Sequence, residues 1–291
     1  MKDVFITKAS GEKSKFSEEK IRRSLQRTGA NNEKINSIIN EISSKLYEGI
    51  TTKKIYRLAF DLLKNDSRHV AARYHLKNAI MELGPSGFPF ERFFAEILNC
   101  QNYKTKVGQI EQGKCVTHEI DVIAEKDDSV FMIECKFHNH QGKFNDVQVP
   151  LYIQSRFKDI EEQWLKLKSH KDKIHQAWVV TNTRFSTDAI CYGACAGLTL
   201  IGWDYPLNGG IKDLIDNLGL YPLTCLTSLT RIDKQRLLDK NIVLCKEIYN
   251  DPNVLQLAGV KPNRINTVIK EAQQLCEHLL NNHIHAENEN K

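Results

Sequence analysis

The chain has 291 residues, of which 41% are hydrophobic and 26% are charged, and its mean hydropathy is −0.44. These values indicate a soluble globular chain long enough for two or three cores, and they exclude an intrinsically disordered one. No segment approaches the roughly 18 apolar residues that a membrane-spanning helix needs. The start, MKDVFITKASGEK, lacks the apolar core of a secretory signal. We therefore expect a cytoplasmic protein without a membrane partner.

Eight cysteines occur along the chain without a Cys-x-x-Cys pair, mostly inside apolar stretches such as IECKF and IVLCKEI. In a cytoplasmic protein such cysteines stay reduced. We expect buried, reduced thiols at Cys100, Cys115, Cys135, Cys191, Cys195, Cys225, Cys245 and Cys276.

Two clusters of glycine and proline divide the chain into three segments. The first cluster runs from Gly84 to Pro89, and the second runs from Trp203 to Gly210. Such residues interrupt helices and strands and mark linkers. We expect domains at residues 1–86, 87–210 and 211–291.

The 41 basic and 36 acidic residues give a net charge of +5, which is too small to indicate a nucleic-acid partner by itself. Residues 1–86 hold 17 basic and 10 acidic residues, residues 87–210 hold 14 and 16, and residues 211–291 hold 10 and 10. The basic excess therefore belongs to the first segment.

The first segment predicts a short β-hairpin followed by four helices. Residues 4–8 and 15–16 flank the turn signal Ser10-Gly11. Ser17 can cap the first helix. The other three helices follow from apolar residues at helical spacing, which are Ile35, Ile38, Ile39, Ile42, Leu46, Ile55, Leu58, Ala59, Leu62, Leu63, Ala72, Leu76, Ala79, Ile80 and Leu83.

The hairpin and the later helix starts carry three distinctive strings. These are Val4...Lys8-Ala9-Ser10-Gly11...Phe16-Ser17-Glu18-Glu19-Lys20-Ile21, then Gly49-Ile50-Thr51-Thr52, then Ala71-Ala72-Arg73-Tyr74. Together they resemble the ATP-cone, a module found at the N-termini of ribonucleotide reductases and in the reductase repressor. The resemblance covers residues 3–86.

This resemblance implies that ATP or dATP binds between the hairpin and the helices as an effector. Lys8 and Lys20 would then contact the phosphates. Ile21 would pack on the base, and Thr52 and Tyr56 would line the pocket. The sequence has no Walker A loop, so nothing indicates ATP hydrolysis by this segment. The alternative is that the two lysines belong to a solvated helix face.

The middle segment predicts a buried helix and a strand hairpin. The apolar stripe of the helix is bordered by Glu91 and consists of Phe90, Phe93, Phe94, Ile97 and Leu98. Two strands follow at residues 115–124 and 130–137, separated by a polar turn.

Acidic and basic side chains recur with the period of these strands. Because side chains alternate along a strand, Glu134 and Lys136 project from one face. The same alternation places Glu119 and Asp121 together on the preceding strand. Phosphodiester hydrolysis uses acidic oxygens to bind Mg²⁺, which activates water, and a lysine to orient or deprotonate the nucleophile. The Asp-x12-Glu-x-Lys spacing therefore predicts a metal-dependent nuclease site.

The order of the surrounding elements supports this motif. We expect a helix near residues 90–98, a short strand near 104–110, the two strands above, a helix near 146–168, a strand at 177–182, a helix near 186–196 and a strand at 198–202. With the strings FERFFAEIL, HEIDVIA and FMIECKF, this order resembles the Mrr-type branch of the PD-(D/E)xK restriction endonucleases over residues 88–203.

The resemblance assigns a role to each residue of the motif. It implies that Asp121 and Glu134 bind Mg²⁺ or Mn²⁺, with the main-chain carbonyl of Cys135 as a further ligand. It also implies Lys136 as the catalytic lysine and Glu91 as the acidic residue on the helix.

Three weaker signals accompany the motif. The residues just before Asp121 lack the glycines that many Mrr-like proteins have there, so the roles of His118 and Glu119 stay open. Gln148 to Tyr152 has the Gln-x3-Tyr spacing of some nucleases of this fold, and coincidence explains it equally well. His138 and His140 could bind zinc with His118, although polar loop histidines are usually solvated.

The last segment predicts small amphipathic helices. Residues 257–265, with Gly259 at the turn, resemble a helix-hairpin-helix that presents backbone N–H groups to a DNA phosphate. Lys261 replaces the usual second glycine, and the segment carries no net charge. A small helical packing domain is an equally good interpretation.

Together these patterns predict a multidomain protein. It has an N-terminal α+β ATP-cone of one hairpin and four helices, a central α/β restriction-endonuclease-like domain and a small all-α C-terminal domain. We expect an enzyme, a Mg²⁺-dependent endodeoxyribonuclease that hydrolyses DNA and is regulated by ATP or dATP. The cone resemblance further implies a homo-oligomer. The alternatives are a nucleotide-responsive DNA-binding regulator with a catalytically silent nuclease fold, and a structural role in an oligomer.

Overall fold

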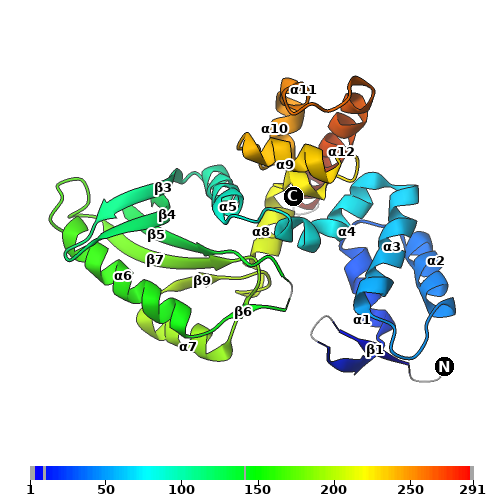
Figure 1. Cartoon of the computed structure of the whole chain (residues 1–291), viewed down its shortest axis with the longest axis horizontal. Coiled ribbons are helices and arrows are strands. Elements are labelled where there is room, and N and C mark those ends of the chain that lie inside the picture. The colour runs from blue at the N-terminus through cyan, green and yellow to red at the C-terminus, as the bar shows by residue number, and fades with distance from the viewer. Residues whose placement is uncertain (1–3, 9–10, 141, 289–291) are drawn as a thin grey trace. The chain divides into compact units, whose positions relative to one another are not determined.

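The computed structural model of the chain describes residues 4–8, 11–140 and 142–288, with side chains up to Glu277. The chain forms two compact units (Figure 1). The helical unit comprises Met1–Ala79, Tyr221–Leu237 and Cys245–Lys291, and the sheet unit comprises Ile80–Leu220 and Leu238–Leu244. The domain limits expected at residues 86 and 210 stay predictions.

The helical unit begins with a β-hairpin and four helices over the described part of residues 4–81, as predicted. These elements are β1 (Phe5–Thr7), β2 (Lys13–Lys15), α1 (Glu18–Gln26), α2 (Asn32–Ser44), α3 (Thr52–Asp66) and α4 (Arg68–Met81). The side chains of Ser17, Asn31 and Thr51 each accept a backbone N–H from the first turn of the helix that follows. Ser10 of the predicted turn lies outside the described residues.

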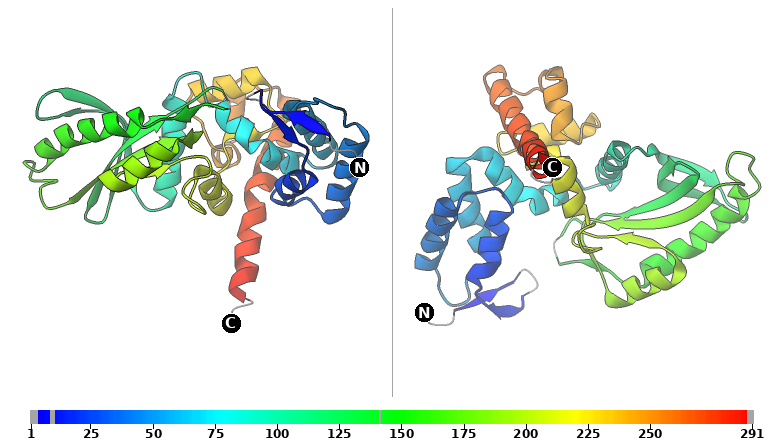
Figure 2. Two further views of the ribbon diagram at one scale, coloured as in Figure 1. Left: turned by 90° about the horizontal axis from the view of Figure 1, so that it is seen from below. Right: turned by 180° about the vertical axis from the view of Figure 1, so that it is seen from behind.

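The hairpin is attached to the helices through the segment that leads into α3 (Figure 2). The Thr7 N–H donates to the Ile50 carbonyl at 3.0 Å, and Thr7 forms a parallel bridge with Thr51. Beneath it lies an aliphatic core of Leu25, Ile35, Ile38, Ile39, Ile42, Ile50, Ile55, Ala59, Leu63, Val70 and Ala71. Burial of these side chains stabilises the small hairpin, which three paired residues could not do alone.

The C-terminal helices pack into the same unit. In chain order they are η1 (Leu223–Cys225), α9 (Arg231–Asp239), α10 (Cys245–Asn250), α11 (Asn253–Leu257) and α12 (Pro262–Asn288). The buried Arg73 of α4 donates to the carbonyls of Thr28 at 3.4 Å and Leu275 at 3.0 Å. Thr224 Oγ1 donates to the Ala79 carbonyl at 2.7 Å. The ends of the chain therefore share one compact unit.

The sheet unit is built on a mixed sheet with the strand order β3-β4-β5-β7-β9. Its strands are β3 (Lys104–Gln112), β4 (Thr117–Lys126), β5 (Ser129–Lys136), β7 (Ile174–Thr181) and β9 (Thr199–Ile201). The first three pair antiparallel, and the last three pair parallel. Its helices are α5 (Phe88–Cys100), α6 (Gln148–Trp164), α7 (Thr187–Ala196) and α8 (Ile211–Leu218). None of the described helices has the length and apolarity needed to cross a membrane.

This arrangement confirms the predicted order of helices and strands, including the strand near residues 104–110. Two details differ. β6 (Phe144–Asn145) and β8 (Arg184–Phe185) form a short parallel pair that the sequence did not predict, because two residues are too few to show a periodic pattern. The long helix ends at Trp164 rather than near residue 168, because the chain continues there in i→i+3 turns.

All eight cysteines are free, as predicted, but half of them are not in the core. The buried ones are Cys135, Cys225, Cys245 and Cys276. The exposed ones are Cys100, Cys115, Cys191 and Cys195. The prediction of core thiols is wrong for the exposed four, because apolar neighbours in sequence do not fix which side of a helix or loop faces solvent.

Candidate active site

Strands β4 and β5 stop pairing where the predicted carboxylates lie. The antiparallel register ends with Val122 opposite Ile133, and Asp121 and Glu134 are the next residues on the two strands. The backbone N–H of Cys135 donates to Asp121 Oδ2 at 2.7 Å. The structure therefore brings Asp121 and Glu134 together on neighbouring strands, in the arrangement that the sequence pattern predicted.

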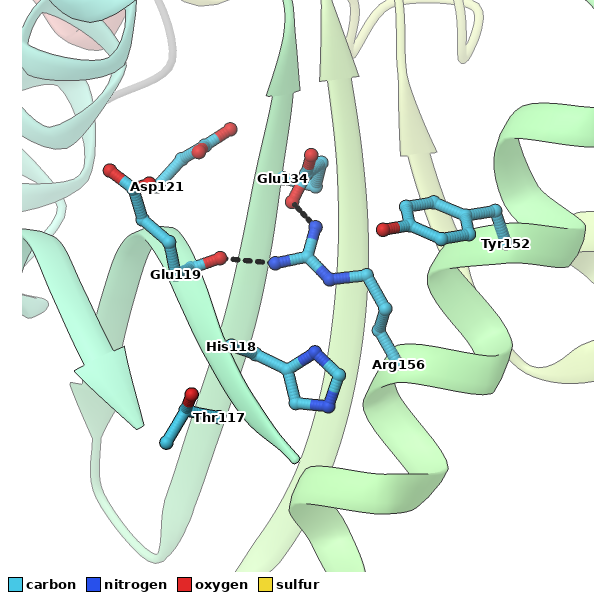
Figure 3. Close-up of a pocket in the computed structure, with 7 residues that line it drawn as sticks. All are labelled: Thr117, His118, Glu119, Asp121, Glu134, Tyr152 and Arg156. Atoms are coloured by element: carbon cyan, nitrogen blue, oxygen red, sulfur yellow. Dashed lines mark hydrogen bonds and ion pairs between the residues drawn. The ribbon is translucent and has the colours of Figure 1, made fainter. Parts of the chain in front are cut away.

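Glu134 is held between two cationic side chains. Its Oε1 accepts a hydrogen bond from Lys136 Nζ at 2.5 Å, and its Oε2 accepts one from Arg156 Nη1 at 2.6 Å. The other terminal nitrogen of Arg156 donates to the Glu119 carbonyl (Figure 3). The side chains of Glu134 and Arg156 are 7% and 11% exposed. Water screens this pair less than a surface pair, so its electrostatic attraction is stronger.

These residues face an open pocket of about 320 Å³ between the sheet and α6. The pocket is lined by Thr117, His118, Glu119, Asp121, Glu134, Tyr152 and Arg156 (Figure 3). The lining is mostly polar and combines three carboxylates with one guanidinium, which suits a charged ligand rather than an apolar one.

Burial and neighbouring acidic groups raise the pKa values of Asp121 and Glu91. Burial, followed by the charge of Glu134, raises the pKa of Asp121 to about 6. Burial, followed by the charges of Asp121, Glu119 and Glu134, raises the pKa of Glu91 on α5 to about 7. The site therefore concentrates negative charge that is only partly compensated by Lys136 and Arg156.

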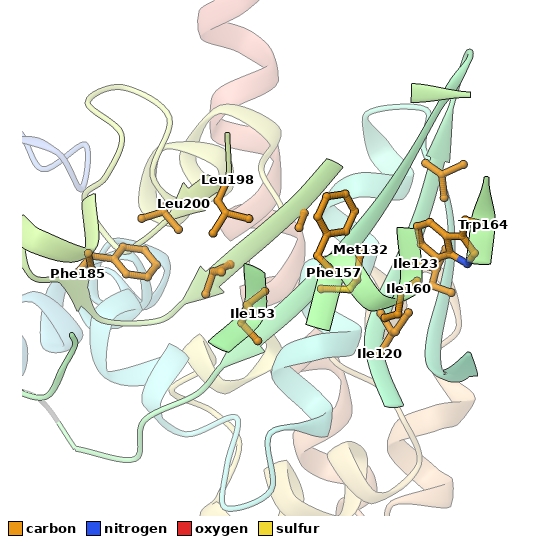
Figure 4. Packing of buried hydrophobic residues seen from close by; sticks show 14 residues of the cluster. Ile120, Ile123, Met132, Ile153, Phe157, Ile160, Trp164, Phe185, Leu198 and Leu200 are labelled. Atoms are coloured by element: carbon orange, nitrogen blue, oxygen red, sulfur yellow. The ribbon is translucent and has the colours of Figure 1, made fainter. Parts of the chain in front are cut away.

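The packing of α6 determines which of its residues reach the pocket. Ile153, Phe157 and Ile160 are at most 5% exposed and anchor the helix in the core of the sheet unit (Figure 4). Tyr152 and Arg156 are each one residue before an anchor, so they lie one turn apart on a neighbouring flank of the helix. The Arg156 guanidinium lies over the Tyr152 ring, 5.6 Å from its centre.

A hard divalent cation suits the donor atoms of this site. The carboxylates of Asp121 and Glu134 are oxygen donors of the type that Mg²⁺ and Mn²⁺ prefer. The charge of Glu134 helps to raise the pKa of Asp121, and a neutralising cation would relieve this repulsion. Cys135 could contribute only its carbonyl, because burial raises the pKa of its thiol. Across the described residues, however, no group of three or more His, Cys, Asp and Glu side chains is placed to hold a metal ion. Both oxygens of Glu134 are instead engaged by cations of the protein.

The His118 ring contacts Asp159 rather than the carboxylates of the motif. Its Nε2 lies 2.8 Å from Asp159 Oδ2 on α6, and the same carboxylate accepts the backbone N–H groups of Cys115 and Val116 at 2.8 and 3.3 Å. These contacts attach the start of β4 to α6. The zinc alternative raised from the sequence finds no support, because His138 likewise contacts Asn145 rather than another metal-binding side chain.

A buried polar network continues from the end of β5. Thr181 Oγ1 donates to the Lys136 carbonyl at 2.7 Å and accepts from Asn145 Nδ2 at 2.9 Å. His138 contacts Asn145 Oδ1 through its ring at 3.0 Å and pairs with Asn182 through its backbone N–H and C=O. This network fixes the backbone at the carboxyl end of β5, where Lys136 lies, and it was not predicted from the sequence.

The sequence interpretation missed the pocket residue Arg156 and left the roles of His118, Glu119 and Tyr152 undecided. Arg156 was not singled out, although it follows Tyr152 by four residues on α6, the first helix after the Glu-x-Lys strand. Of the Gln-x3-Tyr pair, Tyr152 lines the pocket, whereas Gln148 is exposed and does not. The spacing of Tyr152 and Arg156 is the signal that could have indicated a shared helix face.

The predicted nucleotide site of the cone draws on the hairpin, α1 and α3. Lys8, directly after β1, forms an exposed ion pair with Glu12 at 2.9 Å. Thr52 begins α3 next to Thr51, which bridges Thr7, so the hairpin end and the start of α3 lie close together. Lys20 is exposed in the first turn of α1. The roles of these residues in nucleotide binding stay predictions.

Ile21 and Tyr56 have other contacts within the helical unit. Ile21 is half-buried and packs against the aliphatic core. Tyr56 stacks on Tyr74 with ring centres 5.2 Å apart, and its hydroxyl lies 2.7 Å from His75 Nδ1. Both side chains therefore have a structural role whether or not a nucleotide contacts them.

The turn between α11 and α12 uses its N–H groups internally. Gly259 has a φ of +75°, and its N–H donates to the Gln256 carbonyl at 2.8 Å. The Val260 N–H donates to the Leu255 carbonyl at 2.9 Å. These bonds cap α11 in the manner of a Schellman motif. The structure thus favours the packing interpretation of this turn, because these two N–H groups are already used.

Comparison with protein families defines the class of protein. An ATP cone domain model matches residues 4–78, and a restriction endonuclease model matches residues 84–204. A third model, described as AF1548-like, C-terminal, matches residues 221–276. The protein thus joins an N-terminal ATP-cone, a central α/β nuclease-like domain and a C-terminal helical domain, which confirms both resemblances and the predicted fold class.

Individual relatives define the family more closely. The chain is 37% identical over 185 residues to an uncharacterized protein of Archaeoglobus fulgidus, covering 62% of this chain and 98% of that protein. A crystal structure titled as a protein of unknown function, AF1548, aligns with a TM-score of 0.55 and 33% identity, covering 66% of this chain and 99% of that one. The chain therefore belongs to the AF1548-like family. Its domains together support a nuclease with nucleotide regulation.

Proposed function

We propose that the protein is a divalent-metal-dependent endodeoxyribonuclease whose cone binds ATP or dATP and regulates cleavage or assembly. The observation that carries this proposal is the convergence of Asp121, Glu134 and Lys136 at the point where β4 and β5 stop pairing. An acidic pair beside a lysine in a polar open pocket is suited to binding a metal and a phosphodiester.

Each residue of the site has a distinct role in the proposal. Asp121, Glu134 and the Cys135 carbonyl would hold Mg²⁺ or Mn²⁺, which supplies an activated water and compensates the charge of the phosphate. Lys136 holds its ammonium against Glu134 Oε1, and its side chain is 32% exposed, so it can orient the nucleophile beside that carboxylate. Glu91 is the acidic residue of the motif on α5, and burial together with the charges of Asp121, Glu119 and Glu134 raises its pKa to about 7, so it can share a proton with the site near neutral pH.

The regulatory part of the proposal rests on the cone. Lys8 and Lys20 bind the phosphates of ATP or dATP, Ile21 packs on the base, and Thr52 and Tyr56 line the nucleotide pocket. Nucleotide then alters DNA cleavage or the assembly of a homo-oligomer in the cytoplasm. Calorimetric titration of ATP into the full chain tests the lysines. We expect weaker binding for Lys8→Ala and Lys20→Ala, and unchanged affinity would remove them from the site.

A cleavage assay tests the catalytic part. Plasmid and linear duplex DNA are incubated with the full chain and Mg²⁺ or Mn²⁺, with and without ATP or dATP. We expect cleavage of the plasmid by the wild type, its loss with EDTA, and a rate lower by about 100-fold or more for Asp121→Ala. Equal products from the wild type and this variant would point to a contaminating nuclease and defeat the proposal.

A second candidate function is a nucleotide-responsive DNA-binding regulator with a silent nuclease fold. The observation that favours it is the engagement of both Glu134 oxygens by Lys136 and Arg156. Retained DNA binding without cleavage at any metal concentration would support this candidate. A nucleotide effect on sedimentation alone would support a structural role in an oligomer.

A further inference from the structure

Arg156 occupies a position that neither the motif nor the family models assign. It is the buried partner of Glu134 Oε2, and its second terminal nitrogen is bound to the Glu119 carbonyl. Lys136 holds the other oxygen of Glu134. Each oxygen of the central carboxylate therefore already accepts a hydrogen bond from a cationic side chain of the protein.

A divalent cation and Arg156 cannot use the same oxygen of Glu134 together without strong repulsion. Two positive charges sharing one carboxylate oxygen would lie within a few ångströms of each other, beside side chains that are only 7% and 11% exposed, so water screens their repulsion only in part. The Arg156 guanidinium lies 5.6 Å from the centre of the Tyr152 ring, and Tyr152 is 60% exposed, so this ring offers a surface along which the guanidinium can move. Movement toward the pocket mouth would free Glu134.

We propose that Arg156 is a built-in counter-ion that competes with the divalent cation for Glu134 and thereby sets the metal affinity of the site. The inference rests on the proposed function only in taking Glu134 as a metal ligand. Its consequence is a site that stays closed to metal until Arg156 releases the carboxylate. Removing the guanidinium leaves excess negative charge in the pocket and makes cation binding tighter.

The test is a calorimetric titration of Mn²⁺ into the full chain in the absence of DNA. We expect Arg156→Gln to bind Mn²⁺ at least about five-fold more tightly than the wild type, the lower end of a typical coupling between two ligands. Arg156→Lys keeps the charge but loses the planar fork, so its gain is smaller. Arg184→Gln is the matched control, because Arg184 pairs with Asp204 and is 64% exposed.

A double variant shows whether the gain passes through Glu134. In Arg156→Gln combined with Glu134→Gln, the gain in Mn²⁺ affinity should disappear, since the shared ligand is gone. A thermal unfolding curve for each variant confirms that the sheet unit is folded. If Arg156→Gln does not fold, the Mn²⁺ affinity of Arg156→Lys is compared with that of the wild type instead. Equal or weaker Mn²⁺ binding by the folded Arg156 variants, no binding by any form, or a gain that persists in the double variant would overturn the inference.

These outcomes are separable from the fate of the nuclease proposal, because the titration contains no DNA. Tighter Mn²⁺ binding without any cleavage would retain Arg156 as a competing counter-ion and reject the nuclease. Cleavage by the wild type together with unchanged Mn²⁺ affinity in Arg156→Gln would retain the nuclease and reject Arg156 as a competing counter-ion.

Discussion

Asp159 joins three separate donors at the edge of the candidate site. It accepts the N–H groups of Cys115 and Val116 and contacts the His118 ring. The His118 contact, followed by those of Cys115 and Val116, holds the pKa of Asp159 below its usual value of 3.8. Because the folded protein favours the ionised form, Asp159 contributes stability above pH 3.8, and this contribution is lost as the pH falls through the lower, folded pKa.

We expect Asp159→Asn to lower the thermal midpoint of the sheet unit at pH 7. The difference from the wild type should shrink as the pH falls below about 3.8, because the carboxyl of the unfolded wild type then takes up a proton while that of the folded protein is still ionised, and it should vanish below the folded pKa. Tryptophan fluorescence follows this unit, which contains Trp164, Trp178 and Trp203. Asp172→Asn, whose side chain is 84% exposed, is the control. A difference that stays constant from pH 7 to pH 3 would contradict the assigned role of the charge.

The residues of the candidate site differ in how far the sequence predicts them. Asp121, Glu134 and Lys136 were predictable because strand alternation and a short spacing place them together. Arg156 was not, because its contact with Glu134 depends on where α6 docks, which sequence periodicity does not specify. Local spacing therefore predicts the motif residues themselves, whereas the residue that pairs with Glu134 depends on tertiary packing.

At the scale of elements, α8 begins where the chain passes very close to another stretch of backbone. A Cβ atom added at Gly210 would lie 2.8 Å from the Trp203 carbonyl oxygen and 2.9 Å from the Tyr205 nitrogen. Both are backbone atoms and cannot turn aside as a flexible side chain could. The Gly210 N–H also donates to Asp213 Oδ2 at 3.3 Å, which fixes the first turn.

Gly210→Ala should therefore destabilise the sheet unit by about 1–3 kcal/mol through steric overlap. Urea unfolding followed by tryptophan fluorescence measures the change. Leu207→Ala in the same loop is the control, because Leu207 is 88% exposed and its truncation should have little effect. An unchanged unfolding midpoint for Gly210→Ala would show that the backbone can separate here without cost.

Elements with a long periodic pattern were predicted well, and short ones were not. The four N-terminal helices and strands β4, β5 and β7 follow directly from apolar periodicity. The pair β6 and β8 depends on hydrogen bonds between residues about 40 positions apart, and neither strand exceeds two residues. Only the folded unit brings these segments together.

At the scale of the whole molecule, the two ends of the chain build one unit. The Arg73 side chain is 9% exposed and connects α4 to the Thr28 carbonyl and to the Leu275 carbonyl of α12. Its guanidinium also lies over the Tyr221 ring, 5.9 Å from the ring centre. Sequence composition divided the chain into three linear segments and could not predict that the first and last pack together, since such contacts join residues about 200 positions apart.

We expect Arg73→Ala to loosen α12 from the helical unit. The loss of two hydrogen bonds to a charged donor should cost about 2 kcal/mol, and amide hydrogen exchange in residues 262–276 should accelerate accordingly. Arg57→Ala, at an exposed position of α3, should leave this exchange unchanged. If the amide exchange rates of residues 262–276 are the same in Arg73→Ala as in the wild type, other contacts hold α12 in place.

The most direct test of the proposed function is the single-turnover rate of duplex DNA cleavage by Lys136→Ala in saturating Mn²⁺. We expect this rate to be lower than that of the wild type by about 100-fold or more, because in the proposed function Lys136 would act on the nucleophile beside Glu134. Lys143→Ala removes an exposed lysine from a nearby loop and should cleave at the wild-type rate. A wild type that does not cleave, or a Lys136→Ala variant as fast as the wild type, would contradict an active site built on Asp121, Glu134 and Lys136.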